Sequence, residues 1–268
     1  MNILKRTIIV KPVYHQDVFE LLESRYDLYN RPSFIETDPI VVPHSYTKKE
    51  DIEIAAFLTA TIAWGNRTTI IKNAKDLMLL MDKSPYDFTI NTNEKELKTF
   101  TKYVHRTFNS DDCTCFVLAL KNIYKKHGGL EKLFTNKIKQ SNYSVMDAIG
   151  EVRKVFFKLS HLPRTEKHFA DPSRNSAAKR INMFLRWMVR DDNRGVDFGL
   201  WKQIPTDKLI CPLDVHSGNV ARKLDLLSRR QNDRRNVEEL MEALKIYDAK
   251  DPVKYDFALF GLGAFENF

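Results

Sequence analysis

The sequence predicts an all-α protein, and three observations carry that prediction. Apolar residues recur at helical spacing along most of the 268 residues. Stretches that alternate apolar and polar residues are nearly absent, and glycine is scarce, at 9 residues. Strand candidates are limited to residues 7–10 and 40–42. We therefore expect roughly eight or more helices.

The apolar stripes place the helices in order along the chain. The most regular stripe is residues 145–159, which keeps a 4-3-4-3 spacing behind Ser144, a suitable N-cap. The other stripes lie at residues 18–26, 54–62, 70–81, 181–188, 220–227 and 237–244.

The last helix has recognisable start and stop signals. Asp251 is a good N-cap and Pro252 suits the first turn. The helix that follows is expected to bury apolar residues on one face and to end at Gly261 or Gly263.

The length of the chain fits one large domain or two small ones. Two stretches rich in proline and polar residues, 30–46 and 160–175, resemble connectors. We expect residues 1–268 to form a single two-lobed helical domain, with a possible connector between the lobes near residues 160–175.

Composition narrows the class of protein. Lys and Arg number 43 against 35 Asp and Glu, which gives a net charge of +8. This surplus favours an anionic partner, with nucleic acid first and an acidic membrane surface second. Three cysteines (Cys113, Cys115 and Cys211) exclude a disulfide framework, a four-cysteine cluster and a four-cysteine zinc site within this chain.

No apolar run approaches the ~18 residues of a membrane span, and the N-terminal residues lack the apolar stretch of a signal peptide. These features predict a cytoplasmic protein with no membrane attachment. We further expect a monomer that binds double-stranded DNA and needs no cofactor or metal.

The positive charge is concentrated in two segments. Residues 172–190 contain five basic residues and no acid, and residues 222–235 contain six basic residues against two acids. On the helix in the first segment, Lys179, Arg186 and Arg190 share a face that the apolar stripe does not use. Such a face suits a phosphate backbone, although a solvated charged surface explains the same pattern.

The segment Ile-Cys-Pro-Leu-Asp-Val-His, which ends at His216, is the most distinctive in the sequence. Asp214 stands directly before a helix, where a carboxylate caps backbone N–H groups. The same carboxylate is suited to stabilising a developing cation if it has a partner. Lys179 is the best candidate, as an amine nucleophile with a lowered pKa among other cations. The alternatives are a helix cap at Asp214 and an ordinary exposed lysine.

The stretch Pro-Leu-Asp-Val-His, followed by Val-Ala-Arg-Lys-Leu, resembles the segment that carries the catalytic aspartate in the helix-hairpin-helix DNA glycosylase superfamily. A lysine-bearing helix before the aspartate also matches in kind. Over its full length the chain resembles a bacterial family of unknown function, with signatures at residues 179–190, 211–216 and 251–261.

The chain departs from the superfamily pattern in two places. The hairpin sequence at residues 171–178 contains no glycine, and Lys179 and Asp214 are 35 residues apart, a longer separation than in most members. Both features are nearer to the archaeal 8-oxoguanine glycosylase branch, which has a divergent hairpin. The cysteine set that holds the cluster of endonuclease III is missing.

The resemblance implies a DNA repair glycosylase with AP lyase activity on a damaged base such as an oxidised purine, with a two-lobed helical fold and a divergent helix-hairpin-helix element. Asp214 would stabilise the sugar cation and Lys179 would form the Schiff base. The alternative is a non-catalytic nucleic-acid-binding protein on the same fold. The expected nucleic-acid contacts are Arg174, Arg180, Arg186, Arg190, His216, Arg222 and Asn66.

Two of these contacts have a local structural explanation as well. Asn66 follows Trp64 and Gly65 at a turn, where asparagine is common in any protein. His216 stands at a helix start, where its imidazole is as well explained by a local hydrogen bond as by a phosphate.

Overall fold

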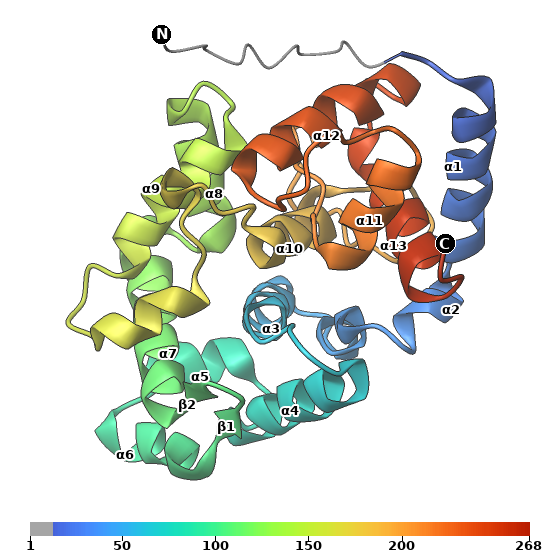
Figure 1. The fold of residues 1–268 in the computed structure, drawn as a ribbon. Helices are drawn as coiled ribbons and strands as arrows, with labels where there is room; N and C mark the ends of the chain where they lie inside the picture. The colour runs from blue at the N-terminus through green and yellow to red at the C-terminus, as the bar shows by residue number, and fades with distance from the viewer. Residues whose placement is uncertain (1–12) are drawn as a thin grey trace, which may run out of the picture.

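Helices make up nearly all the regular structure of residues 13–268, which a computed structural model describes (Figure 1). The all-α prediction is confirmed. The sheet found in this range joins β1 (Val104–His105) to β2 (Phe108–Asn109) in an antiparallel hairpin. The α-helices are α1 (Gln16–Tyr29), α2 (Pro32–Ile35), α3 (Lys49–Thr61), α4 (Arg67–Leu80), α5 (Pro85–Asn91), α6 (Glu94–Leu97), α7 (Ser110–His127), α8 (Leu130–Gln140), α9 (Val145–Phe156), α10 (Lys179–Val189), α11 (Val215–Lys223), α12 (Arg234–Tyr247) and α13 (Asp256–Ala264).

Short 3-10 helices connect several of these elements. They are η1 (Pro39–Val41), η2 (Pro43–Ser45), η3 (Lys98–Lys102), η4 (Pro163–His168), η5 (Pro172–Arg174), η6 (Thr206–Lys208) and η7 (Pro252–Tyr255). Within the described range, no helix is both long enough and apolar enough to span a membrane.

Helix α3 lies at the centre of the fold. Every residue from Asp51 to Thr61 is buried, so the helix is enclosed on all sides rather than on one face. It packs against α10 on one side and against α4 and α5 on the other, as Figure 1 shows. The division into two lobes stays a prediction.

Helix α13 packs between α1 and α11. Its glycines do not end the helix as expected, because α13 continues to Ala264. They allow close packing instead. A Cβ atom on Gly261 would lie 2.0 Å from the ring of Tyr29 in α1, and one on Gly263 would lie 3.0 Å from the carbonyl oxygen of His216 in α11.

Other local predictions have mixed outcomes. Ser144 caps α9, where its hydroxyl accepts a hydrogen bond from the N–H of Asp147 at 3.3 Å. The strand predicted at residues 40–42 is wrong, because Pro39 starts the 3-10 helix η1 there. The strand predicted at residues 7–10 lies outside the described residues. Asp251 does not cap the last helix, since its side chain pairs with Arg190 instead.

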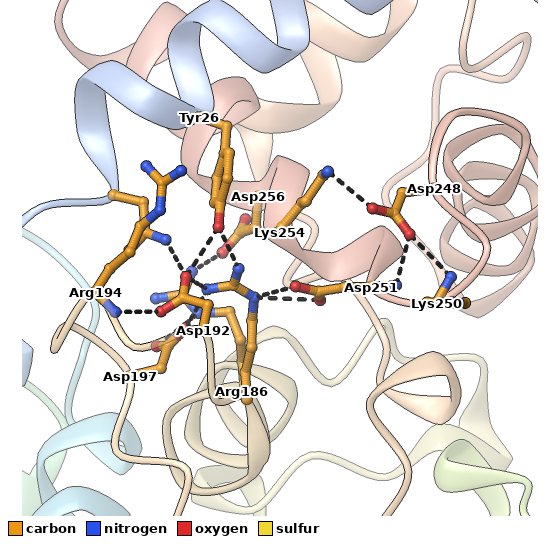
Figure 2. Close-up of polar contacts among 12 residues, drawn as sticks. Tyr26, Arg186, Asp192, Arg194, Asp197, Asp248, Lys250, Asp251, Lys254 and Asp256 are labelled. Carbon is orange, nitrogen blue, oxygen red and sulfur yellow. Dashed lines mark hydrogen bonds and ion pairs between the residues drawn. The ribbon is translucent and has the colours of Figure 1, made fainter.

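The predicted exposed face of Lys179, Arg186 and Arg190 is wrong, because both arginines are buried in ion pairs. Arg190 is completely buried, and its guanidinium lies 2.8 Å from Asp192, 3.2 Å from Asp197 and 2.9 Å from Asp251. Arg186 pairs with Asp197 at 3.2 Å and with Asp256. Figure 2 shows these four aspartates near Arg186. We call this set the arginine–aspartate cluster.

The cluster joins segments that are far apart in sequence. Arg190 also donates a hydrogen bond to the hydroxyl of Tyr26 in α1 at 2.9 Å. Asp192 and Asp197 follow α10, Asp251 precedes η7, and Asp256 starts α13. The cluster therefore links α10, α1 and α13 through charged hydrogen bonds in a buried environment.

We predict that Arg190→Ala lowers the free energy of unfolding by about 3–5 kcal/mol, because it leaves buried carboxylates without their partner. The matched control is Lys72→Ala, which removes an exposed pair with Asp76 on α4 and is expected to change stability by less than about 1 kcal/mol. Urea denaturation of both variants measures the difference. Equal effects of the two substitutions would contradict the structural role of Arg190.

Candidate functional site

A cavity of about 560 Å³ opens between the start of α10, the start of α11, α13 and the turn between α3 and α4. A volume of this size suits a small organic ligand or a single nucleotide. The lining mixes aromatic and ionisable residues: Phe34, Asp38, Pro39, Ala63, Trp64, Gly65, Arg67, Ile70, Lys179, Arg180, Met183, Arg186, Trp187, Pro212, Asp214, Val215, His216, Asp256, Phe257, Phe260 and Ala264.

The structure brings Lys179 and Asp214 together in this cavity. Lys179 is the first residue of α10 and Asp214 is the N-cap of α11. The Lys179 Nζ atom lies 3.5 Å from Asp214 Oδ2, and both side chains are a little over a quarter exposed. The pairing was expected from the resemblance around Asp214 and from the place of Lys179 at the start of a preceding helix, and the two side chains do lie close together.

Asp214 uses its two carboxylate oxygens differently. Oδ1 accepts a hydrogen bond from the N–H of Ser217 at 3.0 Å, and the Ser217 hydroxyl accepts one from the N–H of Asp214 at 3.0 Å. This reciprocal pair is a capping box. Oδ2 is the oxygen that faces Lys179. The Asp214 side chain is therefore both the N-cap of α11 and the charged partner of Lys179.

The segment before Lys179 contains no glycine, but two of its residues take backbone conformations that favour glycine. Asn175 has φ of 65° and Ala178 has φ of 48°, both in the left-handed region. Asparagine adopts this conformation readily, but alanine does so at an energetic cost. A strained residue directly before Lys179 indicates that surrounding contacts fix the start of α10, and strain of this kind is concentrated at functional sites.

Two buried carboxylates in the cavity were not predicted from the sequence. Asp256 starts α13, and burial raises its pKa to about 6 against the opposing charges of Arg186 and Lys179. Asp38 caps η1, and burial likewise raises its pKa, with Arg186 as the main opposing charge. The signature at residues 251–261 contains Asp256, but nothing in its spacing showed that it would face Lys179.

Arg180 and His216, two of the residues expected to contact nucleic acid, line the cavity. The Arg180 guanidinium lies 4.8 Å above the ring of Trp64 and donates a hydrogen bond to the carbonyl of Thr61 at the end of α3. Burial lowers the pKa of Arg180 to about 10. His216 is exposed in the first turn of α11.

Asn66 does not line the cavity, although its neighbours Gly65 and Arg67 do. Its side chain caps α4 by accepting a hydrogen bond from the N–H of Thr69 at 3.1 Å. Arg67 was missed by the sequence reasoning. Its guanidinium lies 5.0 Å from the ring centres of both Phe260 and Phe265.

The two basic segments meet beside the site. The N–H of Arg234 donates to the carbonyl of Asn175 at 3.1 Å, and the Asn175 amide donates to Asp233 at 2.9 Å. We call residues 229–235 the basic loop. Asn232 from this loop donates to the carbonyl oxygen of Asp214 at 2.9 Å, so the loop lies directly beside the cavity.

The remaining two residues expected to contact nucleic acid, Arg174 and Arg222, differ in their exposure to solvent. Arg174 is highly exposed, with Asp171 at 3.6 Å. Arg222 is partly buried and donates hydrogen bonds to Asn219, Asn232 and the carbonyl of Arg229. These bonds hold the basic loop against α11. Among residues 13–268 no group of three His, Cys, Asp or Glu side chains is placed to hold a metal ion.

The raised pKa of Asp256 has a consequence for stability. Because the folded carboxyl binds its proton more tightly than the unfolded one, stability is lost as pH rises from about 4 to 6. The variant Asp256→Asn removes this titration. We predict that its stability relative to the wild type rises by about 2–3 kcal/mol between pH 4 and pH 7. Denaturation at several pH values measures this, with Asp207→Asn, a partly exposed residue outside the cavity, as control. A difference that does not vary with pH would contradict it.

Comparison with known proteins identifies a family but no characterised relative. No curated protein and no solved structure matches the chain. A family model described as "Protein of unknown function (DUF2400)" matches residues 38–265, a range that includes Lys179, Asp214 and nearly all of the cavity lining. The chain therefore belongs to this DUF2400 family.

Proposed function

We propose that the protein is a DNA glycosylase with AP lyase activity, acting through Lys179 and Asp214. The observation that carries the proposal is the 3.5 Å separation of Lys179 Nζ and Asp214 Oδ2 within a cavity of nucleotide size. Two residues 35 positions apart in the sequence converge at one place, as a reaction at a single sugar carbon requires.

The proposed reaction begins with a damaged nucleotide turned out of the duplex into the cavity. As the N-glycosidic bond breaks, the base leaves with the bonding electron pair and the sugar gains positive charge. Asp214 Oδ2 stabilises that charge and is placed to accept a proton from Lys179. The neutral amine of Lys179 then forms a bond to C1′.

The lyase step follows from the same covalent bond. Opening of the C1′–O4′ bond gives an iminium ion between Lys179 and C1′. Loss of a proton from C2′ expels the 3′ phosphate by β-elimination, and water then hydrolyses the imine to release the lysine. The protein's own contribution is to place Nζ at C1′ and a carboxylate beside the developing charge.

The neighbouring surface supports an anionic polymer as partner. Arg230 and Arg235 in the basic loop are exposed, and neither forms an ion pair within residues 13–268. Arg174 lies on the segment that contacts this loop. We propose that these three arginines contact DNA phosphates, in place of the buried Arg186 and Arg190.

A second candidate function is supported by one observation, the capping box of Asp214 with Ser217. If Asp214 serves only as a cap, the protein is a non-catalytic nucleic-acid-binding module. Substitution by asparagine separates the two functions, because asparagine also accepts the Ser217 N–H but carries no charge.

We predict that Lys179→Gln abolishes borohydride trapping on AP-site and damaged-base duplexes while DNA affinity stays nearly unchanged. Asp214→Asn is expected to slow base release by about 10²–10³-fold, the usual cost of losing one charge stabiliser, with binding retained. Trapping gels and single-turnover rates measure these effects.

The matched control is Lys223→Gln, which removes an exposed lysine from the end of α11 and should leave trapping intact. Persistent trapping in Lys179→Gln would place the nucleophile elsewhere, with Lys167 as the next lysine to test. An unchanged rate in Asp214→Asn would leave only the capping role.

We predict that DNA binding weakens with salt and that each of Arg174→Ala, Arg230→Ala and Arg235→Ala reduces the log–log slope by about 0.9, the contribution of one neutralised phosphate. Lys125→Ala, an exposed residue at the end of α7, is the control that should leave the slope unchanged. Fluorescence anisotropy at several salt concentrations gives the slopes. Equal slopes in the wild type, the three arginine variants and Lys125→Ala would exclude the basic loop as the phosphate contact.

A further inference from the structure

Three carboxylates line the cavity, and two of them have partners for both oxygens. Asp214 is held by Ser217 and faces Lys179. Asp256 pairs with Arg186 through Oδ2, and its Oδ1 lies 3.8 Å from the Cys211 thiol. Both carboxylates therefore already have partners within the protein.

Asp38 is different. Its Oδ1 accepts one hydrogen bond, from the N–H of Ile40 at 3.0 Å, and its Oδ2 has no hydrogen bond or ion pair with any residue in the range 13–268. The residue is only 8% exposed, and it lines the cavity. A carboxylate that is nine-tenths buried, with one free oxygen at a cavity wall, is a group that lacks a partner.

Burial raises the pKa of Asp38, while the hydrogen bond from the N–H of Ile40 and the positive charges of Arg186, Arg67 and Lys179 oppose that shift. A carboxylate accepts hydrogen bonds and donates none. When Asp38 is ionised, Oδ2 therefore needs a donor, and a molecule bound in the cavity is placed to supply it.

We propose that Asp38 determines base specificity by accepting a hydrogen bond from an exocyclic amino group of the nucleobase in the cavity. The inference rests on the proposed function, which places a nucleobase there. A base with a carbonyl oxygen at that position would bring a second acceptor against the carboxylate and would be rejected, because neither group supplies a proton.

The experiment uses pairs of damaged bases that differ in one amino group. The first pair is 8-oxoguanine and 8-oxohypoxanthine, and the second is 5-hydroxycytosine and 5-hydroxyuracil. Duplexes carrying each base, and a duplex with an AP site, are given to the wild type, to Asp38→Asn and to the control Asp207→Asn. Asparagine at position 38 can still accept the N–H of Ile40, so the local fold is kept.

The wild type is expected to release the amino-bearing base of at least one pair about 10- to 100-fold faster, the discrimination that one charge-assisted hydrogen bond provides. Asp38→Asn should reduce that ratio to less than about threefold, while AP-site cleavage, which involves no base, stays unchanged. Asp207→Asn should behave as the wild type.

Three results would overturn the proposal. The first is a ratio that Asp38→Asn leaves unchanged, and the second is a preference of the wild type for the bases that lack the amino group. The third is an equal loss of AP-site cleavage in Asp38→Asn, which would indicate a structural role. Failure of the proposed function is distinguishable, because the wild type would then act on no duplex at all.

In that event nucleoside binding decides the role of Asp38. Trp64 lines the cavity, so its fluorescence reports occupancy by guanosine or by inosine, which lacks the amino group. Tighter binding of guanosine by the wild type, lost in Asp38→Asn, would support Asp38 as the amino acceptor. Equal binding of the two nucleosides, or binding of neither, would overturn it.

Discussion

The fold around the cavity depends on the buried pairing of two arginines with four aspartates. Arg186 lies on α10 and Arg190 directly follows it. Their partners come from the loop after α10 and from the segments that begin η7 and α13. Buried charges are unfavourable unless they are paired with good geometry, so this network allows few alternative arrangements. It fixes α13 relative to α10, and with it the position of Asp256, Phe257 and Phe260 in the cavity wall.

Much of the helical architecture could be predicted, because the buried face of a helix appears in the sequence as apolar residues at three- and four-residue spacing. The stripe from Val145 to Phe156 became α9, and the segment around Lys179 became α10. The region from α5 to α8 was missed, although α7 carries Phe116, Leu120 and Ile123 at helical spacing and all three are buried. The strand expected at residues 40–42 failed because three apolar residues after a proline fit a 3-10 turn as well as a strand.

The candidate site was predicted in part. Local sequence signals placed Lys179 and Asp214 at helix starts, and the resemblance around Asp214 suggested that the two residues act together. Asp38, Asp256 and Arg67 reach the cavity through tertiary packing, which leaves no local pattern. The error at Arg186 and Arg190 has the same origin. A helical face with several arginines has the same sequence pattern whether it meets solvent or a set of aspartates supplied by segments further along the chain.

The double use of Asp214 affects how relatives of this protein should be compared. Oδ1 caps the start of α11, while Oδ2 faces Lys179. Selection for a stable fold would therefore keep a capping residue at this position even in a relative without the proposed activity. An aspartate or asparagine there is therefore weak grounds for assigning activity to another member of the family. The residue at the start of α10 is more diagnostic, because Lys179 has no capping role and nothing in the helix itself requires a lysine.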